Sequence, residues 1–523
     1  MHPMTGWWTR TAKPASLALV ICAAVACYGA VREGETGAAT SPGKTTYHVD
    51  SQTGDDANPG TTAAKPWRTL DRVNAMTFAP GDKLLFRAGT RYTGQLRPQG
   101  SGKEGAPIVV AAFGEGPRPR IDGEGRYDET VLLHNVEYWE VNDLEITNAG
   151  ETSEGSRSGV AVSLHDFGTA HHIHLRNLYV HDVNGSNVKG HGRSGIIFGN
   201  GGRQVKSRFD GLLIENCHLV RTDRNGITGW SDYWPRTEWY PNLNVVIRGN
   251  LLEDIGGDGI VPIGCDGALI EHNVLRGGLQ RAQDYAAGIW PWSCDNTVIQ
   301  FNEVSGMRGD RDGQGFDSDW NCRNTLIQYN YSHDNDGGFL LICNDGSSKP
   351  PINAGNVGTV VRYNISQNDG ARTFQISAVE NTAIYNNTIY LRDGMDVLGV
   401  FFHSWSGWAK DTRFTSNVFY AKGTVRYDFG ESTGNVFTNN VFFGNHVDRP
   451  EDPKAITSDP LLVSPGSGGD GLDSVSGYKL SAGSPCIGAG APIANDGGRD
   501  FWGNAVPTAG APDIGAHQST RRP

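Results

Sequence analysis

The chain has 523 residues and a formal net charge of −12. Gly supplies 70 of them, nearly double the usual ~7 % share, and only 37 % of the residues are hydrophobic, which excludes a long apolar helix bundle. The acidic balance disfavours nucleic acid and anionic lipid as primary partners.

The first elements in the chain predict an export signal over residues 1–30. A short positive region precedes an apolar run at residues 17–26, which is too short to span a bilayer, and an A-x-A cleavage site ends it. Cys27 follows at once and offers lipid attachment as an alternative to simple cleavage. We therefore expect a secreted, extracellular protein without a membrane-spanning segment. Residues 31–45 are predicted to be a linker before a single domain over residues 46–520.

An Asn recurs about once every 29 residues between short strands with period-2 alternation, a spacing typical of solenoids. Stacked Asn side chains bond to one another along such an axis, whereas independent turn residues need no common register. The recurring residues are Asn177, Asn216, Asn250, Asn273, Asn302, Asn330, Asn364, Asn387, Asn417 and Asn440. We expect them to form an Asn ladder in a β-solenoid.

Both ends of the domain carry recognisable segments. These are Tyr47-His48-Val49-Asp50 and Pro66-Trp67-Arg68-Thr69-Leu70 near the start, and Asp459-Pro460-Leu461 and Pro512-Asp513-Ile514-Gly515 near the end. With them the chain resembles the right-handed parallel β-helix (pectate-lyase-like) superfamily of secreted carbohydrate-active proteins, most of all its glycoside hydrolase members. The resemblance implies an all-β, right-handed parallel β-helix of roughly ten or more coils. It does not identify the reaction, because that superfamily includes hydrolases, lyases, epimerases and adhesins.

A second kind of strand, mostly opening with Gly, follows many of these asparagines. Aligning these strands on the Gly places the next, apolar residue inside and the second and fourth residues outside. The outward columns then contain Trp230, Trp290, Trp292, Asp317, Asp319, Leu340, Ile342, Gln375 and, on the last of these coils, His403. Indoles beside carboxylates are typical of a glycan groove, since flat aromatic faces stack on sugars. The alternative for the indoles is interior packing.

The acidic stretch around residue 317 is the predicted catalytic centre. Asp317 and Asp319 share a face with Cα atoms about 6.6 Å apart, which suits a general acid paired with a base or nucleophile. Asp312 or Asp336, on neighbouring turns, is an alternative partner. Three other interpretations stay open: Ca²⁺ ligands, plain turn residues, and sugar contacts without chemistry.

The leading function is therefore a glycoside hydrolase that cleaves a plant or microbial polysaccharide or oligosaccharide, acts as a monomer and requires no cofactor. The first alternative is a Ca²⁺-dependent polysaccharide lyase; its candidate bases are Lys189, His191, Arg308, Arg311 and Lys349. The second is a non-catalytic glycan-binding surface protein. The segment around His191 locally resembles the G-H-G element of polygalacturonases, but the triplets that accompany it there are absent. His191 is then a candidate to line the groove, and a place in a solvated loop is the alternative.

Six cysteines follow the export signal, without a C-x-x-C pair or a His/Cys cluster, so no zinc site is predicted. Cys265, Cys294, Cys322 and Cys343 recur five to seven residues after their strand Gly. Disulfides such as Cys265–Cys294 and Cys322–Cys343 fit an oxidising compartment, and a stack of buried free thiols is the alternative.

Overall fold

The computed structural model describes residues 39–189, 194–344 and 350–520. The described residues belong to one compact unit. The predicted export signal and Cys27 lie outside the described residues. No helix in the described ranges is long and apolar enough to cross a membrane.

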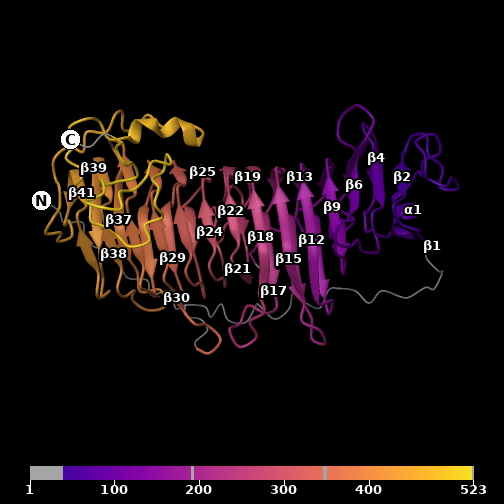
Figure 1. Cartoon of the computed structure of the whole chain (residues 1–523), viewed down its shortest axis with the longest axis horizontal. Helices are drawn as coiled ribbons and strands as arrows, with labels where there is room; N and C mark the ends of the chain where they lie inside the picture. The colour runs from indigo at the N-terminus through magenta and orange to yellow at the C-terminus, as the bar shows by residue number, and fades with distance from the viewer. Residues whose placement is uncertain (1–38, 190–193, 345–349, 521–523) are drawn as a thin grey trace, which may run out of the picture. The chain divides into compact units, whose positions relative to one another are not determined.

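The compact unit is a parallel β-helix, as predicted, with its strands stacked along one axis (Figure 1). Three parallel sheets surround one apolar core. Its first sheet runs the length of the stack, and side chains alternate between the core and the outside, as in the buried Phe209, Leu212 and Ile214 of β15. The strands of this sheet are β2 (Thr46–Val49), β4 (Lys83–Arg87), β6 (Ile108–Phe113), β9 (Trp139–Asn142), β12 (Thr169–Arg176), β15 (Arg208–Glu215), β18 (Asn242–Arg248), β21 (Cys265–Asp266), β22 (Leu269–Glu271), β24 (Val298–Gln300), β27 (Leu326–Gln328), β31 (Val360–Arg362), β35 (Ala383–Tyr385), β38 (Arg413–Thr415) and β40 (Val436–Thr438).

From β4 onward, the second sheet follows the first across a turn in each coil. Its strands are β5 (Arg91–Thr93), β7 (Arg120–Asp122), β10 (Glu145–Asn148), β13 (Tyr179–Val183), β16 (His218–Thr222), β19 (Leu251–Ile255), β23 (Val274–Arg276), β25 (Glu303–Ser305), β28 (Tyr331–His333), β32 (Ile365–Gln367), β36 (Thr388–Leu391), β39 (Val418–Asp428) and β41 (Val441–Val447). Each turn between these sheets needs one residue with a positive φ, such as Gly249 at 64° or His272 at 54°.

The third sheet contains the strands predicted to open with Gly. They are β8 (Glu129–His134), β11 (Ser158–His165), β14 (Ser194–Gly201), β17 (Asn225–Ser231), β20 (Ile260–Val261), β26 (Gln314–Ser318), β29 (Gly338–Cys343), β33 (Arg372–Ser377) and β37 (Asp396–Phe402). The coil of Ile289 joins β20 to β26 through single bridges. The shorter elements are β1 (Ala39–Thr40), β3 (Met76–Thr77), β30 (Asn356–Val357), β34 (Val379–Glu380), the helix α1 (Leu70–Asn74) and a 3-10 helix (Leu472–Tyr478).

The Asn ladder is present, with two corrections. From Asn250 to Asn440, eight of the predicted asparagines form one chain in which each Nδ2 donates to the Oδ1 of the next, and Asp452 accepts from the last. Asn177 and Asn216 were wrongly assigned to the ladder. They occupy the positive-φ turn position one residue earlier, and Cys217 takes the ladder position instead.

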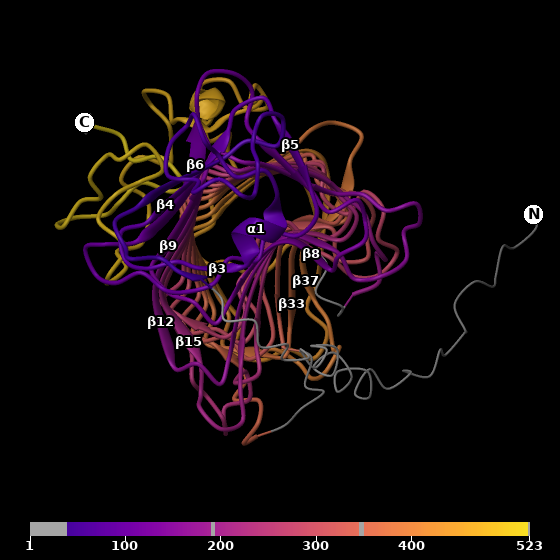
Figure 2. The same ribbon diagram turned by 90° about the vertical axis from the view of Figure 1, so that its right-hand side faces the viewer.

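The closing segment, residues 452–520, lies against the outside of the first two sheets. Tyr478 donates to Gln367 of β32, and Asn386 donates to the carbonyls of Asp513 and Gly515. A tyrosine-rich apolar cluster fills the contact. Viewed along the stack, α1 lies across one end, and the closing segment lies beyond β4 and β6, away from β8, β33 and β37 of the third sheet (Figure 2). The closing segment therefore leaves the outer face of the third sheet to the loops.

The disulfide prediction is wrong, because all six cysteines of the described chain are free thiols. Cys294 and Cys322 point into the core and donate to the carbonyls of Pro262 and Pro291. Cys343 points to the opposite side of its strand, so its thiol cannot reach Cys322. The structure contains the alternative, a set of buried free thiols.

Candidate active site

The outer face of the third sheet brings the predicted indoles and acids together. Strand pairing aligns Trp230, Trp292, Asp319 and His403 in one outward column. A second column, closer to the start of each strand, contains Trp290, Asp317 and Gln375.

Two residues assigned to these columns point inward instead. Leu340 pairs with Phe316, and both Leu340 and Ile342 are buried in the core. The reason is the alignment itself: Gly338 lies opposite Gln314 and Leu340 opposite Phe316, so Phe339 takes the position that Gly315 has on the preceding coil. The outward positions on this coil therefore belong to Leu341 and Cys343.

Asp317 lies buried in the outward face. Its side chain is 2 % exposed, and its Oδ1 has no hydrogen-bond partner among the described residues. Burial raises the pKa of Asp317 well above its usual value, and the neighbouring Asp319 and Asp312 raise it further. These effects favour the protonated form of the Asp317 carboxyl group.

Asp312 and Asp319 are both more exposed than Asp317. Burial raises the pKa of Asp312 to about 7. The charge of Lys189 acts to lower this pKa, and the charge of Asp319 acts to raise it further. Asp319 accepts hydrogen bonds on Oδ1 from the backbone N–H of Trp320 at 2.6 Å and from the thiol of Cys343 at 2.9 Å. The cluster thus contains Asp312, whose carboxyl group titrates near neutral pH, and Asp319, whose carboxylate accepts hydrogen bonds from two donors.

Asp336 is not part of this cluster in the same way. Its exposed carboxylate accepts from the backbone N–H of Gly309 at 2.9 Å, in the turn between the second and third sheets. This contact matches the turn role that was the alternative for Asp336.

The tryptophans divide into two groups. Trp290 is only 4 % exposed; its indole N–H donates to Asp258, and the Lys189 ammonium lies 5.0 Å above its ring. Trp292 instead stacks on Trp320, with ring centroids 4.7 Å apart, and Trp234 approaches both from a loop. We call Trp234, Trp292 and Trp320 the indole cluster.

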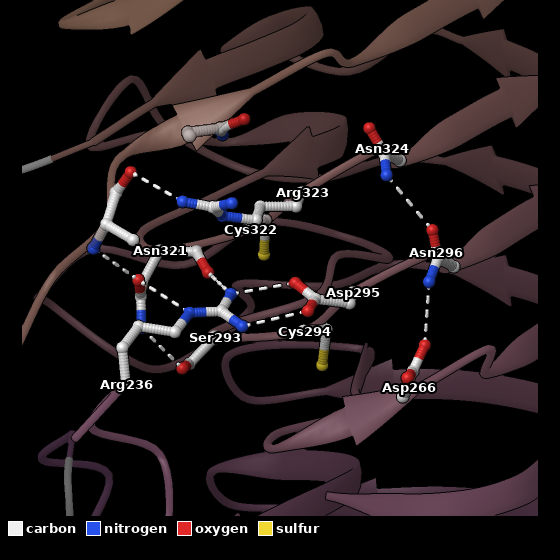
Figure 3. Close-up of polar contacts among 12 residues, drawn as sticks. Arg236, Asp266, Ser293, Cys294, Asp295, Asn296, Asn321, Cys322, Arg323 and Asn324 are labelled. Atoms are coloured by element: carbon white, nitrogen blue, oxygen red, sulfur yellow. Dashed lines mark hydrogen bonds and ion pairs between the residues drawn. The ribbon is translucent and has the colours of Figure 1, made fainter. Parts of the chain in front are cut away.

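An ion pair anchors the loop that supplies Trp234 (Figure 3). Both terminal nitrogens of Arg236 donate to the carboxylate of Asp295, at 2.9 and 2.8 Å, and the guanidinium also contacts Asn321. The carbonyl of Trp234 accepts from Ser293. The loop is thereby fixed to the coils that carry Trp292 and Trp320.

Gln375 forms a hydrogen bond with Gln314, a residue that the alignment of strands did not select. Gln314 donates from Nε2 to Gln375 at 3.0 Å, and its own Oε1 has no partner among the described residues. His403 is exposed at the far end of the column. Burial and the nearby Arg372 lower the pKa of His403, so its ring is neutral near pH 7.

Two cations balance part of the acidic charge. Lys189 donates to the carbonyl of Tyr285 at 3.0 Å, and Arg224 forms ion pairs with Asp258 at 3.2 Å and Asp284 at 2.9 Å. The fields of Asp258 and Asp312 raise the pKa of Lys189, although burial opposes them. Its ammonium therefore stays charged. Of the other predicted residues, Trp230 donates from its indole N–H to Asp232. His191 and Lys349 lie outside the described residues.

Three groups in the described ranges bring together side chains of types that bind metals. In the group of Asp317, Asp319 and Cys343 the third donor is a thiol, which Ca²⁺ does not favour. Glu140, His172 and His174 already share a hydrogen-bond network with Arg176, a cation. The third group is Glu303, His333 and Asp470.

In that third group, His333 lies between the carboxylates of Glu303 and Asp334. These hydrogen bonds raise the pKa of His333 to about 9 against the opposing effect of burial. A protonated ring offers no lone pair to a metal. The donor chemistry of none of the three groups supports a Ca²⁺ site.

Comparison with known proteins points to glycoside hydrolases. No protein-family profile matches the chain. A lacto-N-biosidase of Bifidobacterium longum is 31 % identical over 96 % of this chain, and the chain spans 38 % of that relative's length. The crystal structure of a GH136 lacto-N-biosidase from Eubacterium ramulus matches with a TM-score of 0.60 at 29 % identity, covering 73 % of this chain and 68 % of that one.

A more distant structure, that of XylC with xylose, matches with a TM-score of 0.53 at 12 % identity over 91 % of this chain and 98 % of that one, which supports the fold alone. Together the comparisons confirm the resemblance to carbohydrate-active β-helix proteins, with glycoside hydrolases among them.

Proposed function

We propose that this chain is a glycoside hydrolase that acts on an oligosaccharide, with Asp312 as the general acid and Asp319 as the base or nucleophile. The observation that carries the proposal is the cluster of three carboxyl groups on the outer face of the third sheet, in which burial and mutual repulsion separate the protonation states. Similarity to lacto-N-biosidases supports the same reaction class.

Asp312 suits the general acid because its pKa of about 7 leaves a large protonated fraction at neutral pH. It lies in the turn before β26, where it is partly exposed. A proton on Asp312 is then available to the oxygen of the leaving sugar.

Asp319 suits the base or nucleophile because hydrogen bonds from Trp320 and Cys343 favour its charged form. The positive charge that develops on the sugar ring in the transition state is stabilised by a nearby carboxylate. The protonated form of Asp317, which burial favours, adds no second negative charge beside Asp319.

The indole cluster beside the acids would bind the sugar rings by stacking. For the substrate we propose an oligosaccharide of the kind that the relatives' name indicates, with a lacto-N-biose unit on the non-reducing side of the cleaved bond. Other plant or microbial glycans are the alternative.

Two observations disfavour the lyase alternative. Lys189, one of the predicted bases, has a raised pKa that keeps it protonated and unable to take a proton near neutral pH. Arg311, another, has its guanidinium hydrogen-bonded to the carbonyl of Gln283. The acids themselves are joined to a thiol rather than to further oxygen ligands. Hydrolysis requires neither a lysine base nor Ca²⁺.

The test uses the full chain with lacto-N-tetraose and a panel of plant and microbial glycans. We expect new reducing ends without the ultraviolet absorbance of an unsaturated uronate, and no loss of rate with a chelator. Asp319→Asn should lower kcat by about 10³-fold or more, whereas Asp336→Asn, the matched control, should change it less than about twofold. An unsaturated product, or full turnover by Asp319→Asn, would overturn the proposal.

A further inference from the structure

Cys343 contacts the proposed catalytic carboxylate although no sequence pattern selected it. Because Leu341 lies opposite Asp317 and Ile342 opposite Ser318, Cys343 lies on the outer side of its strand, opposite Asp319. Its Sγ lies 2.9 Å from Asp319 Oδ1. One ligand atom each of Asp317, Asp319 and Cys343 lies within 4.8 Å of the others.

We propose that Cys343 is a positioning residue whose thiol holds Asp319 in its catalytic orientation; this rests on the proposed function of Asp319. The Trp320 N–H and the Cys343 S–H both donate to Oδ1, so they fix one oxygen of the carboxylate and define the direction of the other. A carboxylate held in this way reacts without first reorganising.

The thiol is suited to permanent donation. Burial raises the pKa of Cys343 well above its usual value, and Asp319 and Asp317 raise it further, so the sulfur keeps its proton at any pH at which the enzyme would work. A hydrogen bond to the charged form of Asp319 favours ionisation of that carboxyl group.

Cys322 provides an internal comparison. Its thiol is equally buried but donates to the carbonyl of Pro291 inside the core. Substitution of Cys322 therefore changes packing alone, whereas substitution of Cys343 also removes a donor from Asp319.

Other charged groups near Asp319 also influence the pH dependence of kcat/KM. Those whose charges act on Asp312, Asp317 or Lys189 are Asp258, Arg224 and Arg372, besides these three groups themselves. None is altered by a change at Cys343, so a shift in the acidic limb of the pH profile reports the lost thiol donor.

The experiment compares Cys343→Ala, Cys343→Ser and the control Cys322→Ala in kcat, KM and the pH dependence of kcat/KM. We expect Cys343→Ala to lower kcat by about 10- to 100-fold with little change in KM. The acidic limb should move to higher pH, because Asp319 loses a donor to its charged form. Cys343→Ser, which restores a donor, should recover kcat to within about fivefold, and Cys322→Ala should keep kcat within about twofold.

If Cys343 has only a structural role, the opposite order of kcat is expected: Cys343→Ala is tolerated, and Cys343→Ser is worse because it buries a hydroxyl group. Wild-type kcat and pH profile in Cys343→Ala, or no recovery in Cys343→Ser, would overturn the inference. If Asp319→Asn is inactive in parallel, the proposed function survives that failure; if Asp319→Asn is active, both fail.

Should Cys343→Ala not fold, infrared spectroscopy of the native chain gives a second test. We expect a low-frequency S–H stretching band that moves to higher frequency in Asp319→Asn. An unchanged band would contradict the contact.

Discussion

The β-helix contains two stacks of polar side chains that differ in how they are satisfied. In the Asn ladder every side-chain amide from Asn250 to Asn417 donates a hydrogen bond to the Asn of the next coil, and Asn440 donates to Asp452. On the outer face of the third sheet, Asp317 Oδ1, Gln314 Oε1 and Trp320 Nε1 are buried without partners among the described residues. Satisfied polar stacks stabilise a fold, whereas buried polar atoms that lack partners are suited to a ligand.

The largest effect on stability is expected in the ladder. Asn364→Ala removes the donor to Ile327 and Asn387 and the acceptor for Asn330, leaving buried polar groups unpaired. We expect a loss of about 3–5 kcal/mol in the free energy of unfolding, measured by denaturant titration. Turnover of the folded fraction at low temperature should remain that of the wild type. A selective loss of turnover would show that the ladder contributes to the site.

The acidic cluster should control the pH dependence of activity. A general acid must be protonated, and the pKa of Asp312 is raised to about 7, mainly by burial. The kcat/KM of the wild type should therefore fall about tenfold per pH unit above pH 7. The check is a pH–rate profile with a substrate whose leaving group needs protonation, and an activated aryl glycoside serves as the control with a weaker alkaline limb. A flat profile up to pH 9 would exclude Asp312 as the acid.

The smallest effect is expected at the loop anchor. Arg236→Lys keeps the charge but loses the paired hydrogen bonds to Asp295, and Arg236→Ala loses both. We expect KM to rise about threefold in the first and about tenfold in the second, with kcat changed less, because Trp234 is held less firmly over the indole cluster. Equal KM values in all three proteins would mean that the loop does not position the sugar.

Much of the fold could be predicted from the sequence because every coil imposes the same constraints on the residues at its turn. Each ladder Asn must follow a turn residue with positive φ and precede an apolar strand residue, and these constraints recur in register. The prediction was wrong at Asn177 and Asn216, since an Asn also suits the positive-φ position one residue earlier.

The site was predicted less completely, and the reasons are physical. Asp317 and Asp319 share a face, as the alternation of strand residues requires, and Asp312, predicted as an alternative partner, acts on Asp317 from the preceding turn. Leu340 and Ile342 were placed on the wrong side because the strand was aligned on Gly338, which lies opposite Gln314 rather than opposite Gly315. Trp234 reaches Trp292 through a loop, which no strand pattern describes.

The central claim is that the strained acidic cluster is the catalytic site, and Asp312→Asn tests it most directly. In the unfolded chain this carboxyl group ionises near pH 4, whereas in the folded chain it keeps its proton until about pH 7, so its presence lowers stability as the pH rises between those values.

Unfolding free energy and turnover should be measured on the same Asp312→Asn sample at pH 7. We predict a gain in stability of a few kcal/mol, at most about 4, together with a loss of turnover of about 100-fold or more. The gain should disappear near pH 4. A variant that is less stable than the wild type at pH 7, or one that keeps full turnover, would contradict the account.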